Sequence, residues 1–529
     1  MRAMHVRLAL VAGLALVAVV ITLGTAAGRT SRTPSTPIVA NGSWPTYHRD
    51  NARTGNDPTL PPVISVTAGW TRTGLDGEVY ASPLVHGGKV YTATLNNTVY
   101  ALNQTDGTIE WSSHLGTPQA SGWVCGNVAP MGILGTPVID TVANRIYAVA
   151  EIAGSPPIYH LFGLDLGTGV TVLNTVISPS GFDWKIQQER GALALANGYV
   201  YVPFGGRAGD CFDGSTPYYG WVVGVPTDGI SSQNVFKTPS GAESVWSPGG
   251  VLVDDVSHNV FFATGNAIPC SGSTLSDAIV RVNPTLGSTT FFEPNDWQSN
   301  WCNPDSDLGS ATPVLISPTL MFTAGKHGGG FLLDPTNLGG VDDQLFPTPK
   351  PAAYSQADVC FGDTSAATYG SFAYKAPFIY LECEGQGLVA LNTNTSTPSF
   401  SPCNAACAAP NWHVGAGKLY GAPFVAAGAV WVAGNTGLTA YRANTGALVY
   451  QSASFGVNRF MTPAEAGGQV FVPSHTVMRS FVMHFGLSQS SPAPSAFPRA
   501  SPILQASPQT PGTRSPVPQS SPAPTPVPR

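Results

Sequence analysis

The sequence predicts an all-β fold, a single eight-bladed β-propeller that is closed into a ring by a strand near its N-terminus. One observation behind this prediction is a unit of four short strands that recurs eight times along the chain. The other is the composition, with 59 glycines, 47 prolines and only 10% charged residues, where soluble domains usually have about 25%. Such a chain is rich in turns and poor in the charged side chains that cover helices.

The clearest copy of the unit lies at residues 78–118. Residues 81–85 form a buried run, residues 89–94 alternate between polar and apolar, and a strand at 99–102 follows the Asn96-Asn97 turn. Asp106-Gly107 is a strong hairpin signal before the last strand. Four strands cannot cover both faces of their own sheet, so the unit needs neighbours.

The eight copies begin at a small residue, which proline follows in most of them, and successive starts lie 40 to 65 residues apart. An aromatic residue marks the outer strand of most copies, Trp111 in the first and Phe400 in the sixth. The eighth copy ends near Gly486 without an outer strand, while a spare strand around Trp70 precedes the first copy. Pairing these two closes the ring and removes exposed edges. We therefore expect residues 43–487 to form one propeller, with copies starting at Ser82, Thr136, Ala192, Ser247, Thr312, Ala367, Ala422 and Thr462.

The two ends of the chain differ in composition from the propeller. Residues 1–27 place Arg2 and Arg7 before a long apolar run and end in small residues, which predicts an export signal. The apolar run is also long enough for an uncleaved membrane anchor. Residues 28–42 are expected to be a linker, and residues 488–529, rich in Ser, Pro, Ala and Thr, a disordered tail. The predicted location is extracellular or in the cell envelope, with membrane contact only through the N-terminal segment.

The net charge bears on possible partners, and the cysteine content bears on disulfides and on haem attachment. A net charge of −6 and a pI of about 5.9 give no basic patch for nucleic acid. Eight cysteines, an even number in an exported chain, predict disulfides, and Cys403 and Cys407 flank a short loop that one bridge could close. The sequence has no C-x-x-C pair and no C-x-x-C-H motif, so covalent c-type haem is excluded.

Two stretches resemble a known family. The repeat SPLVHGGKVYTATLNNTVYALNQTDGTIEW at 82–111 and the entry segment SWPTYHRDNARTG at 43–55 are similar to the pyrroloquinoline quinone (PQQ) repeat of the quinoprotein alcohol dehydrogenase-like propellers. The resemblance covers nearly all of residues 43–487. It is specific for the fold but not for function, because the family includes dehydrogenases as well as non-catalytic binding or assembly scaffolds.

The resemblance implies a catalytic site within residues 244–334. In the dehydrogenases a tryptophan forms the floor beneath the flat quinone, and Trp246 stands at the matching position. A cationic residue bonds the quinone oxygens, and Lys326 matches it. An aspartate serves as the base that an alcohol oxidation needs, and the extra residues in this segment leave Asp296, Asp305 and Asp307 open, with Asp296 and Asp305 as the leading candidates.

The same resemblance implies a calcium ion, which needs several oxygen ligands. Asn266, in the Thr264-Gly265-Asn266 turn, matches the family's asparagine ligand. The third copy departs from the pattern, because Arg207 or Ala208 stands near the expected glutamate, and Asp210 is the nearest substitute carboxylate. Many family dehydrogenases also carry two adjacent cysteines near the quinone, where this chain has only Cys125.

Two hypotheses follow. The first is an exported PQQ- and Ca²⁺-dependent dehydrogenase that oxidises an alcohol or a sugar and uses an external electron acceptor. The second is a non-catalytic exported propeller whose axial mouth binds a protein or a glycan. The residues at 244–334 favour the first hypothesis, and the missing glutamate and paired cysteines favour the second.

Overall fold

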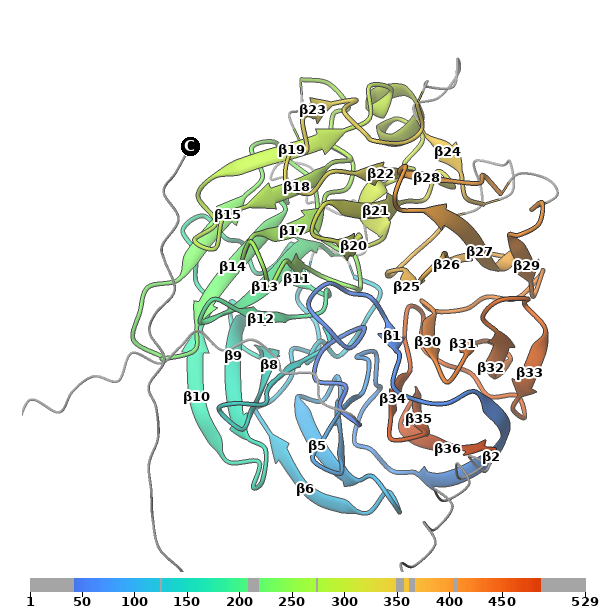
Figure 1. The fold of residues 1–529 in the computed structure, drawn as a ribbon. Helices are drawn as coiled ribbons and strands as arrows, with labels where there is room; N and C mark the ends of the chain where they lie inside the picture. The colour runs from blue at the N-terminus through green and yellow to red at the C-terminus, as the bar shows by residue number, and fades with distance from the viewer. Residues whose placement is uncertain are drawn as a thin grey trace, which may run out of the picture. The chain divides into compact units, whose positions relative to one another are not determined.

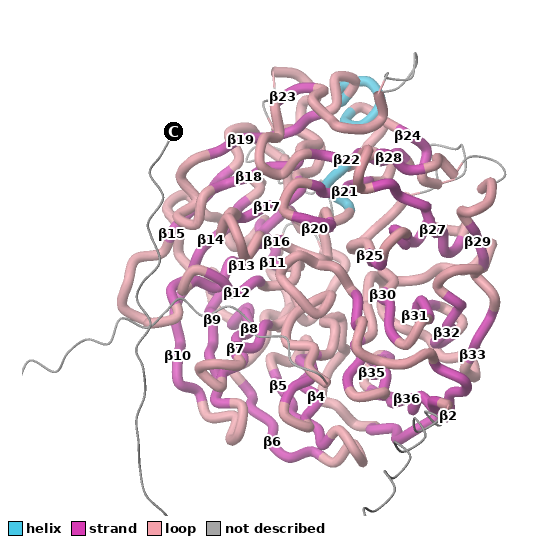
Figure 2. The backbone as a smooth tube through the Cα atoms, viewed as in Figure 1, coloured by secondary structure: helices cyan, strands magenta, loops and turns pink. Residues whose placement is uncertain are grey.

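A computed structural model of the chain describes residues 42–486 except 124–125, 208–217, 273–274, 349–355, 361–366 and 404–406. Eight sheets stand around a common axis, as Figure 1 shows. The described helix consists of a π-helical turn, η1 (Trp297–Cys302), and a 3-10 turn, η2 (Leu308–Ser310), drawn in cyan in Figure 2. Neither has the length or the apolar character to cross a membrane, and no other helix among the described residues does. The predicted all-β, eight-bladed propeller is confirmed.

The first four blades follow chain order from the axis outward, with β11 added beside β13 and β23 added outside β19. Their strands are β3 (Leu84–His86), β4 (Lys89–Ala93), β5 (Thr98–Asn103) and β6 (Ile109–His114); β7 (Val138–Asp140), β8 (Arg145–Ile152), β9 (Ile158–Asp165) and β10 (Thr171–Val176); β11 (Gln187–Glu189), β12 (Ala194–Ala196), β13 (Tyr199–Gly206), β14 (Trp221–Pro226) and β15 (Asn234–Lys237); β16 (Leu252–Val253), β17 (Val260–Ala263), β18 (Ile279–Val282), β19 (Thr289–Glu293) and β23 (Gly340–Val341).

The last four blades take in the two strands nearest the N-terminus, β1 in the seventh blade and β2 in the eighth. Their strands are β20 (Val314–Ser317), β21 (Leu320–Ala324), β22 (Gly329–Leu333) and β24 (Ala357–Asp358); β25 (Ala373–Lys375), β26 (Phe378–Cys383), β27 (Gly387–Asn394), β28 (Ser399–Phe400) and β29 (Trp412–Val414); β1 (Asn56–Asp57), β30 (Phe424–Ala426), β31 (Ala429–Gly434), β32 (Gly437–Arg442) and β33 (Leu448–Gln451); β34 (Ala464–Ala466), β35 (Gln469–Ser474), β36 (Val477–Phe485) and β2 (Val63–Arg72).

The ring closes as the sequence predicts. Strand β2 pairs antiparallel with β36 and completes the eighth blade. The Trp70 ring on β2 packs against Phe471, with 5.8 Å between ring centroids, and its indole N–H donates to the carbonyl of Gln104 in the first blade, 2.8 Å away. One side chain therefore joins the closing strand to both the last blade and the first.

The same tryptophan contact recurs between other blades and corrects one prediction. Trp111 donates its indole N–H to the Leu166 carbonyl of the next blade at 3.0 Å. In the sixth blade Trp412, on β29, makes this contact with the Ala443 carbonyl at 3.1 Å. Phe400 was expected in that position, but it is buried between blades against Phe322 and Phe346. The chain after β28 returns to pair a second time with β27, which a repeat-by-repeat alignment does not anticipate.

The entry segment, residues 43–57, runs around the axis and joins the inner strands to one another, as the dark blue chain at the centre of Figure 1 shows. It begins with a backbone pair between Trp44 and Val85 of the first blade and ends as β1, parallel to β30 of the seventh. Between these points its carbonyl groups accept backbone hydrogen bonds of 2.7–3.1 Å from five further inner-strand amides, those of Ile139, Val253, Leu315, Tyr374 and Val425.

Arg53 is the central side chain of this segment. It is fully buried, and its guanidinium donates to the carbonyls of Val251, Leu193 and Tyr47 and to the Thr46 hydroxyl, at 2.7–3.1 Å. Burial lowers the pKa of Arg53 to about 10, so the group stays charged at neutral pH. Because its acceptors belong to the third blade, the fourth blade and the entry segment, Arg53 ties three parts of the ring together.

Glu189 predicts a pH dependence of stability. It is buried on β11, where one carboxylate oxygen accepts from the Gly135 amide and the other has no partner among the described residues. Burial raises the pKa of Glu189 to about 8 from its ordinary 4.5. The unfolded chain therefore loses this proton at lower pH than the folded chain, so stability falls as the pH rises from 4.5 to 8 and the full penalty, about 5 kcal/mol, remains above pH 8.

Replacing Glu189 by Gln is expected to remove this penalty, because an amide keeps the hydrogen bond and does not ionise. Denaturant unfolding of Glu189→Gln at pH 5 and pH 8 should show a flatter pH dependence than the parent chain, with the gain at pH 8. An equal change in the free energy of unfolding at pH 5 and at pH 8 would contradict the assignment of this pH dependence to Glu189.

Candidate axial site

A cavity of about 430 Å³ opens at the axis. Its walls come from the loops that precede the inner strands and from those that follow the second strands of the blades. The entry segment lies next to this cavity. Its Tyr47 lines a second, smaller space, and four residues line both spaces: Tyr80, Arg190, Arg459 and Phe460. The residues that line the cavity are Tyr80, Asn127, Val128, Arg190, Gly206, Tyr218, Ser244, Trp246, Asn266, Asp305, Asp307, Lys326, Tyr369, Arg459 and Phe460.

The cavity brings together four of the six residues that the resemblance implies: Trp246, Asn266, Asp305 and Lys326. Asp307, the third candidate for the base, lines it as well. Asp296 does not: its carboxylate accepts from the Asn300 side chain at 2.8 Å at the start of η1. Asp210 lies outside the described residues, as do Cys125 and Cys211.

Lys326 lies between two of the aspartates. Its ammonium nitrogen is 2.5 Å from the Asp307 carboxylate and 3.2 Å from that of Asp305. It also lies 5.3 Å from the centre of the Trp246 ring. Burial alone would lower the pKa of Lys326, but the charges and hydrogen bonds of Asp307 and Asp305 outweigh burial and raise it. Lys326 is therefore a permanent cation at neutral pH, held over the tryptophan.

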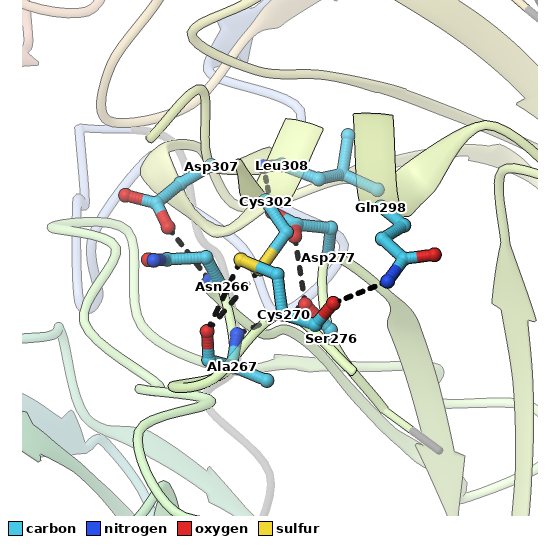
Figure 3. The surroundings of a disulfide bond; sticks show 9 residues. All are labelled: Asn266, Ala267, Cys270, Ser276, Asp277, Gln298, Cys302, Asp307 and Leu308. Carbon is cyan, nitrogen blue, oxygen red and sulfur yellow. Dashed lines mark hydrogen bonds between the residues drawn. A yellow bond between two sulfur atoms is a disulfide. The ribbon is translucent and has the colours of Figure 1, made fainter. Parts of the chain in front are cut away.

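Asp307 approaches Trp246 and Asn266 closely because residue 265 is glycine. A Cβ atom at Gly265 would lie 2.7 Å from Asp307 Oδ1 and 3.2 Å from Trp246 Nε1. The same Asp307 oxygen accepts from the Asn266 backbone amide at 2.8 Å. The Asn266 side-chain amide makes no hydrogen bond to another described residue, and Figure 3 shows it projecting to the same side as the Asp307 carboxylate. Carboxylate and amide are thus presented to the cavity as a pair.

A disulfide lies directly behind this pair. Cys270–Cys302 links the loop that follows Asn266 to η1, which leads into Asp305 and Asp307 (Figure 3). Asp277 adds a second tie, because its carboxyl accepts from the Leu308 backbone amide at 3.1 Å and from the Ser276 hydroxyl at 2.9 Å. Burial and then the nearby Asp307 charge raise the pKa of Asp277. The described residues contain two more disulfides, Cys360–Cys383 and the expected Cys403–Cys407.

Loss of the Cys270–Cys302 bridge should destabilise the chain more than loss of Cys403–Cys407. The bridges have sequence separations of 32 and 4, for which chain entropy gives about 3.7 and about 1.9 kcal/mol. The double variants Cys270→Ser/Cys302→Ser and Cys403→Ser/Cys407→Ser can be compared by denaturant unfolding under oxidising conditions. Equal unfolding free energies would contradict the structural role given to the first bridge.

Sequence reasoning missed two cations in the cavity, Arg190 and Arg459. Arg459 pairs with Glu384 at 2.7 Å and lies over the rings of Tyr369 and Phe460. Arg190 lies 5.6 Å from the Phe460 ring centre and has no ion-pair partner among the described residues. Each arginine comes two or three residues before a predicted blade start, and that position could have identified both, since such residues face the axis.

The described residues do not build a calcium site. In the third blade Gly206 faces the cavity, while the next residue, Arg207, is buried and pairs with Glu151 at 2.7 Å. That leaves the neutral Asn266 amide and the Asp305 and Asp307 carboxylates, both of which pair with Lys326, where calcium needs several oxygen ligands. Among the residues that the structure describes, no group of three or more His, Cys, Asp or Glu side chains is placed to hold a metal ion.

The described residues do fit a flat anionic ring system. Trp246, Tyr369 and Phe460 offer aromatic faces around the cavity, with ring centroids 5.0–6.5 Å apart. Lys326 and Arg459 already pair with carboxylates, whereas the Arg190 guanidinium lacks a counter-ion among the described residues. Aromatic faces bind planar rings, and an uncompensated cation favours an anion.

Comparison with known proteins agrees with this architecture. A sequence model of the family described as outer membrane protein assembly factor BamB matches residues 69–209. No curated protein matches the chain in sequence. Among solved structures, the quinohemoprotein alcohol dehydrogenase from Comamonas testosteroni superposes with a TM-score of 0.61 at 16% identity, over 84% of this chain and 81% of that one.

Two further solved structures match the chain. A europium-containing methanol dehydrogenase has a TM-score of 0.61 at 12% identity, over 83% of this chain and 98% of that one. BamB from Moraxella catarrhalis has a TM-score of 0.50 at 12% identity, over 79% and 99%. At such identities a structural match shows the fold alone. The resemblance to the PQQ-repeat propellers is confirmed at that level: the chain is an eight-bladed β-propeller with the fold of the quinoprotein alcohol dehydrogenases.

Proposed function

We propose that the axial cavity binds a flat, anionic quinone such as PQQ and that the chain is an exported oxidoreductase acting on an alcohol or a sugar. The observation that carries the proposal is the convergence of Trp246, Asn266, Asp307 and Lys326 on one cavity. An aromatic floor, a hydrogen-bonding amide, a carboxylate and a cation are the groups that such an oxidation needs.

The cations and aromatic rings account for quinone binding. Trp246 supplies the face on which the rings stack, and Lys326, held over that face, bonds the quinone oxygens. Arg190, which has no ion-pair partner among the described residues, compensates a carboxylate group of the quinone. When bound, the quinone supplies an acceptor for two electrons, which an external acceptor then removes.

Asp307 is the base in this proposal. Its side chain is only 5% exposed, whereas that of Asp305 is 59% exposed, so Asp307 is the carboxylate that water screens least. Asp307 takes the proton from the substrate hydroxyl, and the ion pair with Lys326 holds the Asp307 carboxylate in place. Asp305 holds Lys326 from the rim of the cavity. The described residues build no calcium site, and the ammonium group of Lys326 supplies the positive charge instead.

Export is part of the proposal. Residues 1–27 have the pattern of an export signal or a signal anchor. The three disulfides of the described residues support it, because disulfides persist in oxidising compartments outside the cytosol.

The second candidate is a non-catalytic exported propeller that binds a protein or a glycan through its axial mouth. The observation that favours it is the Lys326 ammonium, which pairs with both aspartates of the cavity and would weaken either as a base. The match of residues 69–209 to the BamB family model is consistent with this candidate.

Dye-coupled oxidation distinguishes the two candidates. The full chain is incubated with PQQ, either with calcium or with EDTA, and given ethanol or glucose with an artificial electron acceptor. The first candidate predicts quinone-dependent reduction of the dye that Lys326→Met abolishes. Quinone binding without any dye reduction would favour the second candidate.

A further inference from the structure

A second cavity, of about 190 Å³, lies beside the axial one, between the sixth, seventh and eighth blades. The two cavities share Tyr369, Arg459 and Phe460, which form the wall between them. The second cavity is smaller than the roughly 300 Å³ at which pockets for drug-sized ligands begin. It therefore suits a single small ring.

The polar groups of this side pocket are short of partners. Glu382, on β26, is 3% exposed and lines the pocket, where the Tyr420 backbone amide is its hydrogen-bond donor. The Asn435 side chain accepts a long bond of 3.5 Å from the Leu419 amide, and its NH₂ group makes no hydrogen bond within the described part of the chain. Asn458 donates to Glu78 and to the Val79 carbonyl, which leaves its side-chain oxygen available.

The pocket carries little net charge. Glu384, on its rim, is paired with Arg459 at 2.7 Å. Burial and then the charge of Glu384 raise the pKa of Glu382 well above its ordinary value, which favours the protonated carboxyl, a group that can both donate and accept a hydrogen bond. Hydroxyl groups need both kinds of partner. The rings of Tyr369, Tyr420 and Phe460 line the same space and offer faces for the C–H side of a sugar ring.

We infer that this side pocket is a binding site for one neutral sugar ring, with Glu382 and Asn435 bonding its hydroxyl groups. A cationic ligand is the competing possibility, and two observations argue against it: Arg459 already occupies Glu384, and burial of Glu382 disfavours its charged form. The inference goes beyond the proposed oxidation, because it requires neither a quinone nor turnover. If both hold, the pocket positions the non-reacting ring of a glycoside beside the axial site, across Tyr369, Arg459 and Phe460.

Saturation-transfer NMR on the full chain without quinone tests the inference. The probes are the methyl glycosides of glucose, galactose and mannose, with choline as the cationic comparison. Transfer to at least one glycoside is expected, with choline failing to displace it. Glu382→Leu and Asn435→Ala should each weaken its binding about tenfold, the loss of one hydrogen bond.

The variants are chosen to separate binding from folding. Asn435 is exposed, so Asn435→Ala leaves the core intact, and Glu382→Leu removes a buried carboxyl without opening a cavity. Asn394→Ala, at an exposed asparagine outside the pocket, is the matched control and should bind as the parent does. Transfer to none of the glycosides, binding of choline in their place, or unchanged binding in both pocket variants would overturn the inference. None of these outcomes depends on quinone binding.

Discussion

Replacing Arg53 by Met is expected to lower the free energy of unfolding by roughly 3–5 kcal/mol, because the change leaves several buried acceptors without a donor. The acceptors are the carbonyls of Val251, Leu193 and Tyr47. They belong to different blades and to the entry segment, so one substitution weakens the ring at its centre. Denaturant unfolding of the full chain measures the loss.

Two further variants make this prediction specific. Arg53→Lys keeps the charge but not the planar fork of donors, so its loss should be intermediate. Arg72→Met is the matched control, because the Arg72 side chain makes a single hydrogen bond among the described residues, to the Gly107 carbonyl on the rim, and about 1 kcal/mol is expected there. Equal losses at Arg53 and Arg72 would show that the entry segment does not hold the blades together.

Replacing Asp307 by Asn is expected to reduce the rate of quinone-dependent oxidation by about 10²–10⁴-fold, the usual contribution of a general base. The Asn amide cannot take up the proton of the substrate hydroxyl. It also carries no charge, so Lys326 loses its nearest ion-pair partner. Dye-coupled rates at saturating substrate, together with an unfolding curve, separate loss of the base from loss of the fold.

The other aspartates are matched controls for this change. Asp296→Asn should leave the rate unaltered, because Asp296 lies outside the cavity beside Asn300. Asp305→Asn, at a largely exposed side chain on the rim, should have a small effect. A large loss of rate in Asp296→Asn with no loss in Asp307→Asn would place the reaction elsewhere. Asp296, a leading candidate from the sequence, would then be the base.

The fold was predictable from the sequence because its signals are local. Asn97 and Gly107 occupy left-handed turn positions, as the Asn-Asn and Asp-Gly signals indicate, and the unpaired strand around Trp70 pointed to ring closure. The path of the entry segment was not predictable, because its contacts join residues far apart in the sequence. The carbonyl of Gly55, for example, meets the amide of Val425. The repeat pattern of the sequence does not predict such a contact.

The candidate site was predictable in part for the same reason. Asn266 and Lys326 each follow the second strand of their blade, β17 and β21, and Trp246 precedes the first strand of the fourth blade. The repeat pattern therefore brings all three to the axis. The choice of aspartate was not readable, because η1 and the Cys270–Cys302 bridge turn Asp296 away from the cavity and direct Asp307 into it. Arg190 precedes the third copy and Arg459 the eighth, so both lie outside residues 244–334, where the resemblance implied the catalytic site.

The central claim, that the axial cavity binds an anionic quinone, is tested most directly by thermal unfolding of the full chain with PQQ, in EDTA and in calcium. Quinone at a hundred times its dissociation constant should add about 2.7 kcal/mol of stability. Trp246→Ala and Asn266→Ala should abolish that gain, and Asp296→Asn should preserve it. No stabilisation in either condition, or an equal gain in all three variants, would contradict the account.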